Sequence, residues 1–301
     1  FTKDIQKKLT EMSEPELLWP FSNPPYIRNA DDIPNGAFDP NKAYERDYRS
    51  HIENRYGKYK MCMCGIHVNF SFADELLQAD FACSDFEDFR EYKDQLYVDL
   101  AANCTAGAWL MTAVTAASPV MDSSYYEVNN PGETLFMGLA STRCSSLGYW
   151  NFFSPLLDYR YIKAYTKSIK NYVDMGLIKA PSELYFPIRL KPPGKNLLQR
   201  LHDEGVCHIE LRMVDLNPLE LSGINLLDLK FAHYLLVYLA SQPKVDLSLK
   251  YQVECIQNFK DAAHYDLDAG KRNLPGIGVM TFAEAGIRVI DRMKVFYKDF
   301  S

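Results

Sequence analysis

The stretches GIHVNFSF at residues 65–72 and HIELRMVDLNP at residues 208–218 decide the fold, because polar and apolar residues alternate strictly in both. A period of two predicts two β-strands, each with one face in the core. The opposite faces would carry the polar side chains His67, Asn69, Ser71, His208, Glu210 and Arg212. Imidazole, carboxylate and guanidinium groups are suited to bind a metal ion and a transferring phosphate. We therefore expect the two strands to be two walls of one catalytic cavity.

Composition and charge exclude several classes of protein. The chain has 301 residues, 47% of them apolar, which is enough for a large core in one domain or two. The net charge of −6 provides no basic field for a polyanion, so we expect no nucleic-acid partner. No apolar run approaches the ~18 residues of a membrane span, and no signal peptide is recognisable, so we expect a cytoplasmic protein without a membrane partner. The spacing of the seven cysteines fits neither a zinc ribbon nor a redox pair, and we expect reduced thiols.

Hydrophobic periodicity and turn residues predict a mixture of helices and strands. Helices are expected around Ile5, Leu9 and Met12, at 44–57, at 85–117, from an N-cap at Ser154 to Gly176, at 225–242, and from a capping box at Thr281 and Glu284 to the end. The helix at 225–242 is apolar almost all round, which predicts burial on several sides. Strands are expected at about 61–72, 134–142, 184–190 and 206–215. Regular crossover helices do not separate these strands, so we expect an α+β fold with a largely antiparallel sheet.

Common nucleotide-binding and hydrolase motifs are missing from the sequence. The patterns GxxxxGK[ST] and GxGxxG are absent, so side chains and a metal ion would have to hold the phosphates of a bound nucleotide. Neither a His-x-x-x-His pair nor a Ser- or Cys-centred nucleophile elbow is found. Hydrolysis by a protein nucleophile therefore has little support.

Each polar motif also has a purely structural interpretation. A single strand histidine such as His67 is more often a structural residue, and Glu210 with Arg212 taken alone fits a weak surface ion pair. Their apolar neighbours instead favour a half-buried charge pair that requires a partner ion. The other motifs are weak in isolation: Arg143 with Tyr149 fits a solvated loop, Tyr185 with Arg189 an edge strand, and Tyr48 with Arg49 ordinary packing and solvation.

Taken together and in this order, the motifs resemble the glutamate–cysteine ligase family, including the ligase portion of bifunctional glutathione-synthesising proteins. The matching stretches, spread from about residue 18 to 224, are LWPFSNPPYI, RDYRSHIENRYGKY, GIHVNFSF, STRCSSLGYWN, ELYFPIRLKPP and HIELRMVDLNPLELSGI. Weaker similarity continues to the end of the chain. The combination of GIHVNFSF with IELRMVDLNP makes the resemblance specific.

The resemblance implies a fold, a reaction and a set of site residues. The fold would be glutamine-synthetase-like, with a largely antiparallel sheet forming a cup, surrounded by helices, that holds Mg²⁺ and ATP. ATP would phosphorylate the γ-carboxylate of glutamate, and the amine of cysteine would attack the acyl phosphate, the first step of glutathione biosynthesis. His67 and Glu210 would be metal ligands, and Mn²⁺ would substitute well at a site with a histidine. Arg212 and Asn69 would contact the transferring phosphate or the nucleotide, and the amino-acid pocket would be lined by Tyr48, Arg49, Arg143, Tyr149 and Tyr185.

The chain departs from the family pattern in ways that affect this expectation. The family's carboxylate-rich first strand, which supplies further metal ligands, would precede residue 1. We therefore expect residues 1–301 to be the single-domain core region of a longer protein, able to fold but inactive by itself. Val68 and Met61 replace the residue types usual in the family, which affects details of the pocket. Two alternatives stay open: a non-catalytic or regulatory relative, and a ligase that uses another amine acceptor. The sequence predicts no oligomeric state.

Overall fold

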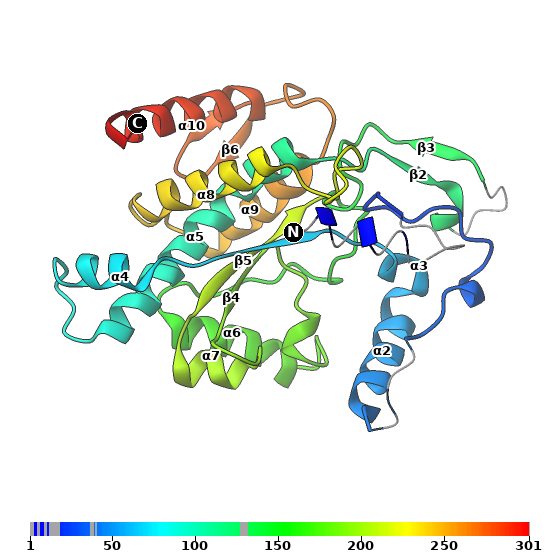
Figure 1. Ribbon diagram of the computed structural model, residues 1–301, viewed down its shortest axis with the longest axis horizontal. Helices are drawn as coiled ribbons and strands as arrows, with labels where there is room; N and C mark the ends of the chain where they lie inside the picture. The colour runs from blue at the N-terminus through cyan, green and yellow to red at the C-terminus, as the bar shows by residue number, and fades with distance from the viewer. Residues whose placement is uncertain are drawn as a thin grey trace.

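The computed structural model describes residues 3, 4, 7, 8, 11, 19–36, 39, 41–126 and 132–300 (Figure 1). Ile5, Leu9 and Met12, around which an N-terminal helix is expected, lie outside these residues. Within the described ranges, no helix is long and apolar enough to cross a membrane.

A three-stranded antiparallel sheet forms the centre of the molecule. Strand β5 (His208–Val214) lies in the middle, with β1 (Ile66–Phe70) on one side and β4 (Ile188–Lys191) on the other. The predicted α+β class with an antiparallel sheet is thereby confirmed. Asn69 and Arg189 both lie opposite Glu210 in the register, so the polar faces of the three strands coincide.

The apolar face of the sheet packs against the long helix α5 (Phe89–Thr115). Ile209 and Leu211 of β5 are almost completely buried there, as their alternation predicts. Helix α5 begins after Asp88, whose side chain accepts a hydrogen bond from the Glu91 amide. Helices α8 (Leu226–Ala240) and α9 (Leu249–Asp261) pack against α5, and α10 (Phe282–Phe296) packs on α8 (Figure 1).

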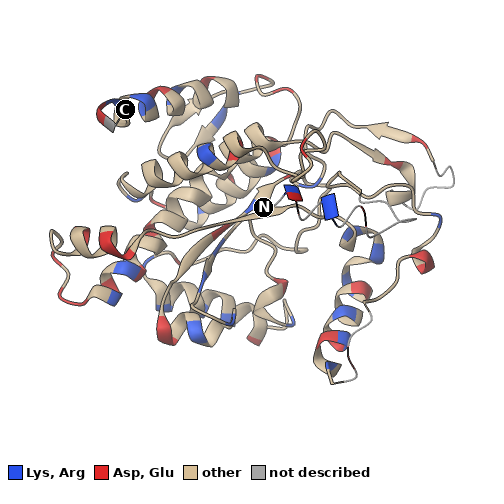
Figure 2. Cartoon of the chain, in the orientation of Figure 1, with Lys and Arg blue, Asp and Glu red and all other residues tan. Residues whose placement is uncertain are grey.

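The remaining described elements surround this core. They are α2 (Ala43–Tyr56), α3 (Lys58–Met61), α4 (Asp74–Phe81), α6 (Ile162–Asp174), α7 (Leu198–Glu204), the pair β2 (Val120–Asp122) and β3 (Thr134–Phe136), the pair β6 (Arg272–Leu274) and β7 (Gly278–Met280), and the 3₁₀ helices η1 (Ala30–Asp32), η2 (Ser123–Tyr126), η3 (Pro181–Glu183) and η4 (Lys298–Phe300). Helix α2 projects to the lower right in Figure 1, and both signs of charge occur along it (Figure 2).

The helix expected from Ser154 begins only at Ile162, which corrects the predicted boundary. The segment before it is extended because side chains bind its backbone. The Gln252 side chain accepts a hydrogen bond from the Leu157 amide at 2.8 Å and donates one to the Leu157 carbonyl at 2.8 Å. A side chain from another helix thus replaces the partners that a helical turn would supply.

The strands are shorter than the sequence predicts. The strand expected from 61 begins at Ile66, because residues 58–61 form the helical turn α3. The strand expected from 184 begins at Ile188, directly after the short helix η3 and a buried loop. The strand expected at 134–142 ends at Phe136.

Helix α8 is less buried than its composition predicts. Leu235 and Leu236 are buried, but Leu226 and Leu227 in the first turn are 64% and 70% exposed. The expectation of burial on several sides is therefore wrong for the N-terminal half of the helix. The capping box of α10 is confirmed, since Thr281 and Glu284 bond reciprocally through side chain and backbone.

Candidate active site

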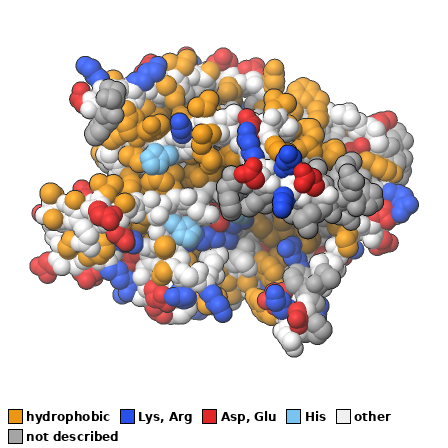
Figure 3. Space-filling model, in the orientation of Figure 1, with side chains coloured by type: hydrophobic (Ala, Val, Ile, Leu, Met, Phe, Trp, Pro, Cys, Tyr) orange, Lys and Arg blue, Asp and Glu red, His pale blue; other side chains and the backbone are white. Residues whose placement is uncertain are grey.

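Most of the predicted site residues line one cavity of about 580 Å³ above the polar face of the sheet. Helix α2 contributes Tyr48 and Arg49, β1 and β5 contribute His67 and Arg212, and the loops contribute Arg143, Tyr149 and Tyr185. The described lining has one carboxylate, Glu45, against three arginines, so the cavity is suited to an anionic or zwitterionic ligand. On the face of the molecule that is turned to the viewer in Figure 3, basic side chains gather beside a histidine near the middle.

Glu210 lies below this cavity, surrounded by two cationic side chains and an imidazole. His67 Nδ1 lies 3.3 Å from Glu210 Oε1, Lys191 Nζ lies 3.1 Å from Oε2, and Arg212 Nη1 lies 3.5 Å from Oε2. The strand register produces this arrangement, because three adjacent strands present their polar faces to the same side. The two strand motifs therefore do meet, as their alternation predicts. Asn69 is exposed opposite Glu210, outside the cavity lining.

The electrostatics of Glu210 favour the ionised form. Burial by itself would raise the pKa of its carboxyl, but the hydrogen bond with His67 and the charges of Lys191 and Arg212 outweigh burial and lower the pKa to about 2. Burial lowers the pKa of Lys191 and of Arg212, and the charge of Glu210 opposes that effect. Although the ion pairs lie close, Glu210 Oε2 is buried and has no hydrogen-bond partner of good geometry among the described residues.

The same observations test whether a divalent cation fits here. The unpartnered Oε2 and the imidazole of His67 are suitable ligand atoms. In the part of the chain that the structure describes, however, no group of three or more His, Cys, Asp or Glu side chains is arranged to hold a metal. Lys191 and Arg212 also crowd the carboxylate. The described residues thus provide at most two ligands and do not by themselves complete a metal site.

Arg143 supports the end of β5 from beneath the cavity wall. Its guanidinium donates to the carbonyl of Arg212 and, at 3.3 Å, to that of Val214, and it pairs with Asp215 at 3.4 Å. A side chain at Gly65 would collide with this guanidinium, with its Cβ only 2.2 Å from Cζ, which explains the glycine before the first strand motif.

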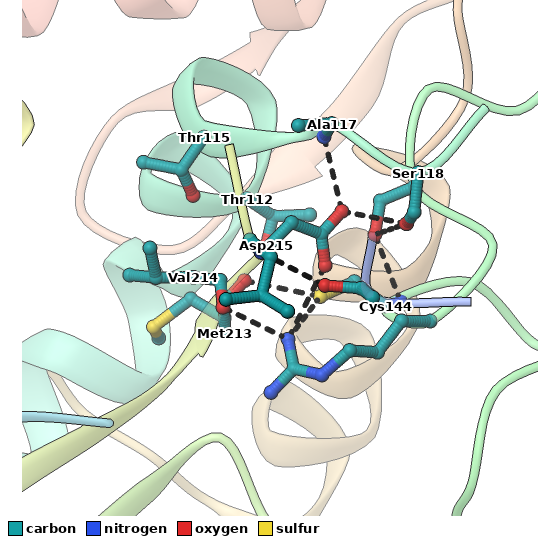
Figure 4. Close-up of polar contacts among 12 residues, drawn as sticks. Thr112, Thr115, Ala117, Ser118, Cys144, Met213, Val214 and Asp215 are labelled. Carbon is teal, nitrogen blue, oxygen red and sulfur yellow. Dashed lines mark hydrogen bonds and ion pairs between the residues drawn. The ribbon is translucent and has the colours of Figure 1, made fainter. Parts of the chain in front are cut away.

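Asp215 is itself held on several sides (Figure 4). Its Oδ2 accepts hydrogen bonds from the Ala117 amide at 3.0 Å and from the Ser118 hydroxyl at 2.7 Å. The structure thus gives Arg143 a supporting contact to the backbone that carries Arg212. Its predicted contact with an amino-acid substrate stays a prediction.

Tyrosine rings form an aromatic wall in the cavity lining. The hydroxyls of Tyr149 and Tyr185 are 2.6 Å apart, and the ring of Tyr56 packs edge-on against both rings at 5.2 and 5.5 Å. Burial raises the pKa of Tyr149 and of Tyr185, so both phenols are neutral hydrogen-bonding groups. Gly148 is required before Tyr149, because a Cβ there would lie 1.9 Å from the Arg143 carbonyl oxygen.

Helix α2 adds Tyr48 and Arg49 to the cavity lining. Burial raises the pKa of Tyr48, with a hydrogen bond to Ser182 opposing the shift. Arg49 is exposed and has no hydrogen bond or ion pair with another described residue. It is therefore available to bind a ligand carboxylate.

Three residues of the site region escaped the sequence analysis. Lys191 follows Arg189 by two residues in the alternating strand IRLK, so the two share a face. That alternation could have placed Lys191 on the same side of the sheet as Glu210. Glu183 and Asp215 gave no such signal, since each is a single acidic residue in a loop motif.

Arg189 does not join Tyr185 in the cavity. It is buried and donates to the carbonyls of Pro181 at 2.8 Å and Ser182 at 3.1 Å, and its strand β4 lies at an edge of the described sheet, as the structural interpretation predicts.

Comparison with known proteins identifies the family. The family model of glutamate-cysteine ligase matches residues 1–262. The chain belongs to the glutamate–cysteine ligase family. It is 34% identical over 292 residues to the glutathione biosynthesis bifunctional protein of Listeria innocua, covering 94% of this chain and 38% of that protein. The corresponding bifunctional protein of Clostridium perfringens is 34% identical over 82% of this chain and 33% of its own length.

Two solved structures share the fold. The glutamate–cysteine ligase of Francisella tularensis in complex with AMP matches with a TM-score of 0.84 at 21% identity, over 99% of this chain and 66% of that one. The bifunctional glutathione synthetase of Pasteurella multocida matches with a TM-score of 0.81 at 22% identity, over 99% of this chain and 37% of that one. The ligase fold expected from the sequence is therefore confirmed. This member of the glutamate–cysteine ligase family spans well under half the length of its bifunctional relatives.

Proposed function

We propose that the cavity belongs to the active site of an ATP-dependent ligase that joins the γ-carboxylate of glutamate to the amine of cysteine through a γ-glutamyl phosphate. The observation that carries this proposal is the convergence of Arg49, Arg212 and His67 with the tyrosine pair on one cavity in a chain of this family. Phosphoryl transfer depends mainly on positioning and charge stabilisation, and these residues supply both. No protein nucleophile is needed for such a reaction.

We assign a role to each part of the cavity. Arg212 would stabilise the charge on the transferring phosphoryl group, because its guanidinium is held by Glu210 and still lines the cavity. Arg49 would bind a substrate carboxylate, and the neutral phenols of Tyr149 and Tyr185 would orient the amino acid by hydrogen bonds. ATP as the co-substrate is supported by the AMP bound to the Francisella tularensis enzyme. Asn69 would contact the nucleotide from the exposed edge of β1.

We further propose Mg²⁺ as the cofactor, with Mn²⁺ able to substitute. When bound, such an ion neutralises phosphate charge. His67 and Glu210 would provide two of its ligands, and the others would have to come from outside the described residues. Residues 1–301 would then form one core region of the ligase, located in the cytoplasm.

The incomplete ligand set favours a second candidate, a relative that binds an amino acid without catalysing ligation. Such a protein would keep the tyrosine wall and Arg49, but the pair formed by His67 and Glu210 would serve only to hold Arg212. A ligase with another amine acceptor is the remaining alternative.

One assay separates these candidates. The intact protein that contains this chain is incubated with ATP, and phosphate release and γ-glutamyl product are followed together. We expect ATP consumption only when glutamate, an amine acceptor and a divalent cation are all present, with cysteine as the best acceptor. ATP turnover without γ-glutamyl product would disprove the proposal, binding of glutamate without turnover would favour the non-catalytic relative, and a better acceptor than cysteine would identify the other ligase.

A further inference from the structure

Glu183 is a buried carboxylate that the proposed reaction does not use. It lies at the end of η3, ahead of β4, and its side chain is completely buried. A buried charge is destabilising unless it is fully paired, so such a residue is expected to have a set of fixed partners. Both of its oxygens have them.

The partners of Glu183 come mainly from one helix. Glu183 Oε1 accepts a hydrogen bond from the Tyr56 hydroxyl at 2.9 Å and pairs with Arg55 Nε at 3.3 Å. Oε2 lies 3.2 Å from His51 Nε2 and accepts a hydrogen bond from the Lys179 amide at 2.6 Å. Three of these four groups belong to the last two turns of α2, the helix that carries Tyr48 and Arg49.

Helix α2 has other polar contacts, such as those of Arg55 with the Leu177 carbonyl at 2.5 Å and of Lys179 with the Asp47 carbonyl at 3.4 Å, but little apolar burial. Ile52 and Tyr56 are its buried residues, and most of its remaining side chains are exposed. Apolar contacts of two residues fix the distance of a helix from its neighbours, but they only weakly resist its rotation about its axis and its sliding along it. Directional contacts to one rigid carboxylate resist both of these motions.

The same carboxylate is connected to the tyrosine wall. The Asn151 amide donates to the Glu183 carbonyl at 2.8 Å and to the Tyr56 hydroxyl at 3.0 Å, and its oxygen accepts from the Tyr185 amide at 2.8 Å. One network therefore joins α2 to the backbone of Tyr185 in the cavity lining.

We propose that Glu183 is a positioning residue: its buried carboxylate holds α2 in place, and thereby sets where Tyr48 and Arg49 lie relative to the tyrosine pair in the cavity lining. This role rests on the proposed function in that the cavity must receive an amino acid. Because the partners of the Glu183 carboxylate do not include Arg212 or Glu210, its influence should be confined to amino-acid binding.

The test uses Glu183→Gln in the intact protein, which keeps the shape of the side chain but removes the charge. We expect the KM for the amino acid bound by Arg49 to rise about tenfold, with kcat changed less than about threefold and the KM for ATP unchanged. Glu53→Gln is the matched control, because Glu53 lies on the same helix and its described partners are Asn35 and Lys58 at the surface. It should leave all three parameters unchanged.

A double-mutant cycle distinguishes positioning from a general loss of structure. If Glu183 acts through α2, Glu183→Gln in an Arg49→Met background should change the amino-acid KM less than about twofold. Additive effects, or an equal rise in the KM for ATP, would overturn the proposal. If Glu183→Gln does not fold, His51→Gln replaces it in the same cycle, since it removes one contact and leaves the carboxylate in place.

Hydrogen exchange gives a readout that does not depend on activity. In the Glu183→Gln variant the amides of residues 51–56 should exchange faster, while those of α5 should keep their protection. Unchanged exchange at α2 would contradict the positioning role even in an active enzyme. If the wild-type protein forms no γ-glutamyl product, the proposed reaction fails, and the exchange experiment still decides whether Glu183 holds α2.

Discussion

Glu183 and Glu210 are buried carboxylates beside the cavity, and both have basic groups around them, yet they are satisfied to different degrees. Each oxygen of Glu183 has two polar partners within 3.3 Å, including a backbone amide and a hydroxyl. Glu210 faces the cationic side chains of Lys191 and Arg212 and the imidazole of His67, but its Oε2 lacks a hydrogen bond of good geometry among the described residues. The first arrangement is closed, whereas the second can still accept a ligand atom.

This difference distinguishes a carboxylate that supports the structure of the candidate active site, Glu183, from one that is suited to bind a ligand, Glu210. A carboxylate with all its partners in the protein is a fixed part of the scaffold. A carboxylate that is charged, buried and incompletely bonded is costly to maintain, and such groups are typical of sites that bind a ligand. The four predictions that follow test this comparison, starting with the largest expected effect.

The pH dependence of stability should reveal Glu210. Its pKa is lowered in the folded protein from 4.5 to about 2, so its stabilising contribution is complete well above pH 4.5 and is lost as the pH falls from 4.5 towards 2. The full contribution corresponds to roughly 3 kcal/mol. In metal-free buffer, the difference in unfolding free energy between wild type and Glu210→Gln should shrink by up to this amount as the pH falls from about 6. Urea unfolding at several pH values measures it.

The exposed Glu204, paired with Arg200, provides the control for this experiment. Glu204→Gln should produce a much smaller pH-dependent difference, because solvent screens the pair. A pH-independent difference for Glu210→Gln would mean that its charge is not stabilised by the surrounding cations.

Arg212→Ala should reduce kcat of the intact enzyme by on the order of 10²-fold, equivalent to about 2.7 kcal/mol of transition-state stabilisation. Folding should change little, because Lys191 still pairs with Glu210 and His67 still contacts it. Steady-state kinetics and a thermal unfolding curve measure the two effects, with Arg200→Ala as a surface control. An unchanged kcat would mean that Arg212 takes no part in the reaction. It would also contradict the interpretation that Glu210, unlike Glu183, belongs to the reacting part of the site.

Tyr149→Phe should mainly weaken the binding of an amino acid. The change removes a hydroxyl that bonds Tyr185 at 2.6 Å and faces the cavity, a loss of about 1.5 kcal/mol or roughly tenfold in apparent affinity. The KM for ATP should stay the same. An equal loss of affinity for ATP would mean that the tyrosine wall also contacts the nucleotide. It would contradict the assignment of Tyr149 to amino-acid binding.

Tyr56→Phe should have the smallest effect, a loss of stability of about 1 kcal/mol. It removes one of the four partners of Glu183 and leaves Arg55, His51 and the Lys179 amide in place. Chemical denaturation measures the change. A loss of several kcal/mol would show that the Glu183 network is less redundant than its geometry indicates.

The sequence by itself determined the class of the fold and most members of the site. Strict alternation in two strand motifs specified which side chains share a face, because the side-chain period of a strand admits only that solution. The alternation therefore assigned His67 and Glu210 to the walls of one cavity, and the strand register brings them into contact at 3.3 Å. Helix α5 was likewise evident from its periodicity.

Only the tertiary structure decided what each polar group bonds to. Arg189 is turned to backbone carbonyls, and the segment before α6 is extended because Gln252 of another helix binds its backbone. Lys191 and Glu183 acquire their roles from neighbours far away in the sequence. Periodicity reports which face a residue occupies, but a hydrogen bond or ion pair between distant segments depends on where the whole chain places its partner. For that physical reason the two carboxylates, which look alike in the sequence, differ in the folded protein.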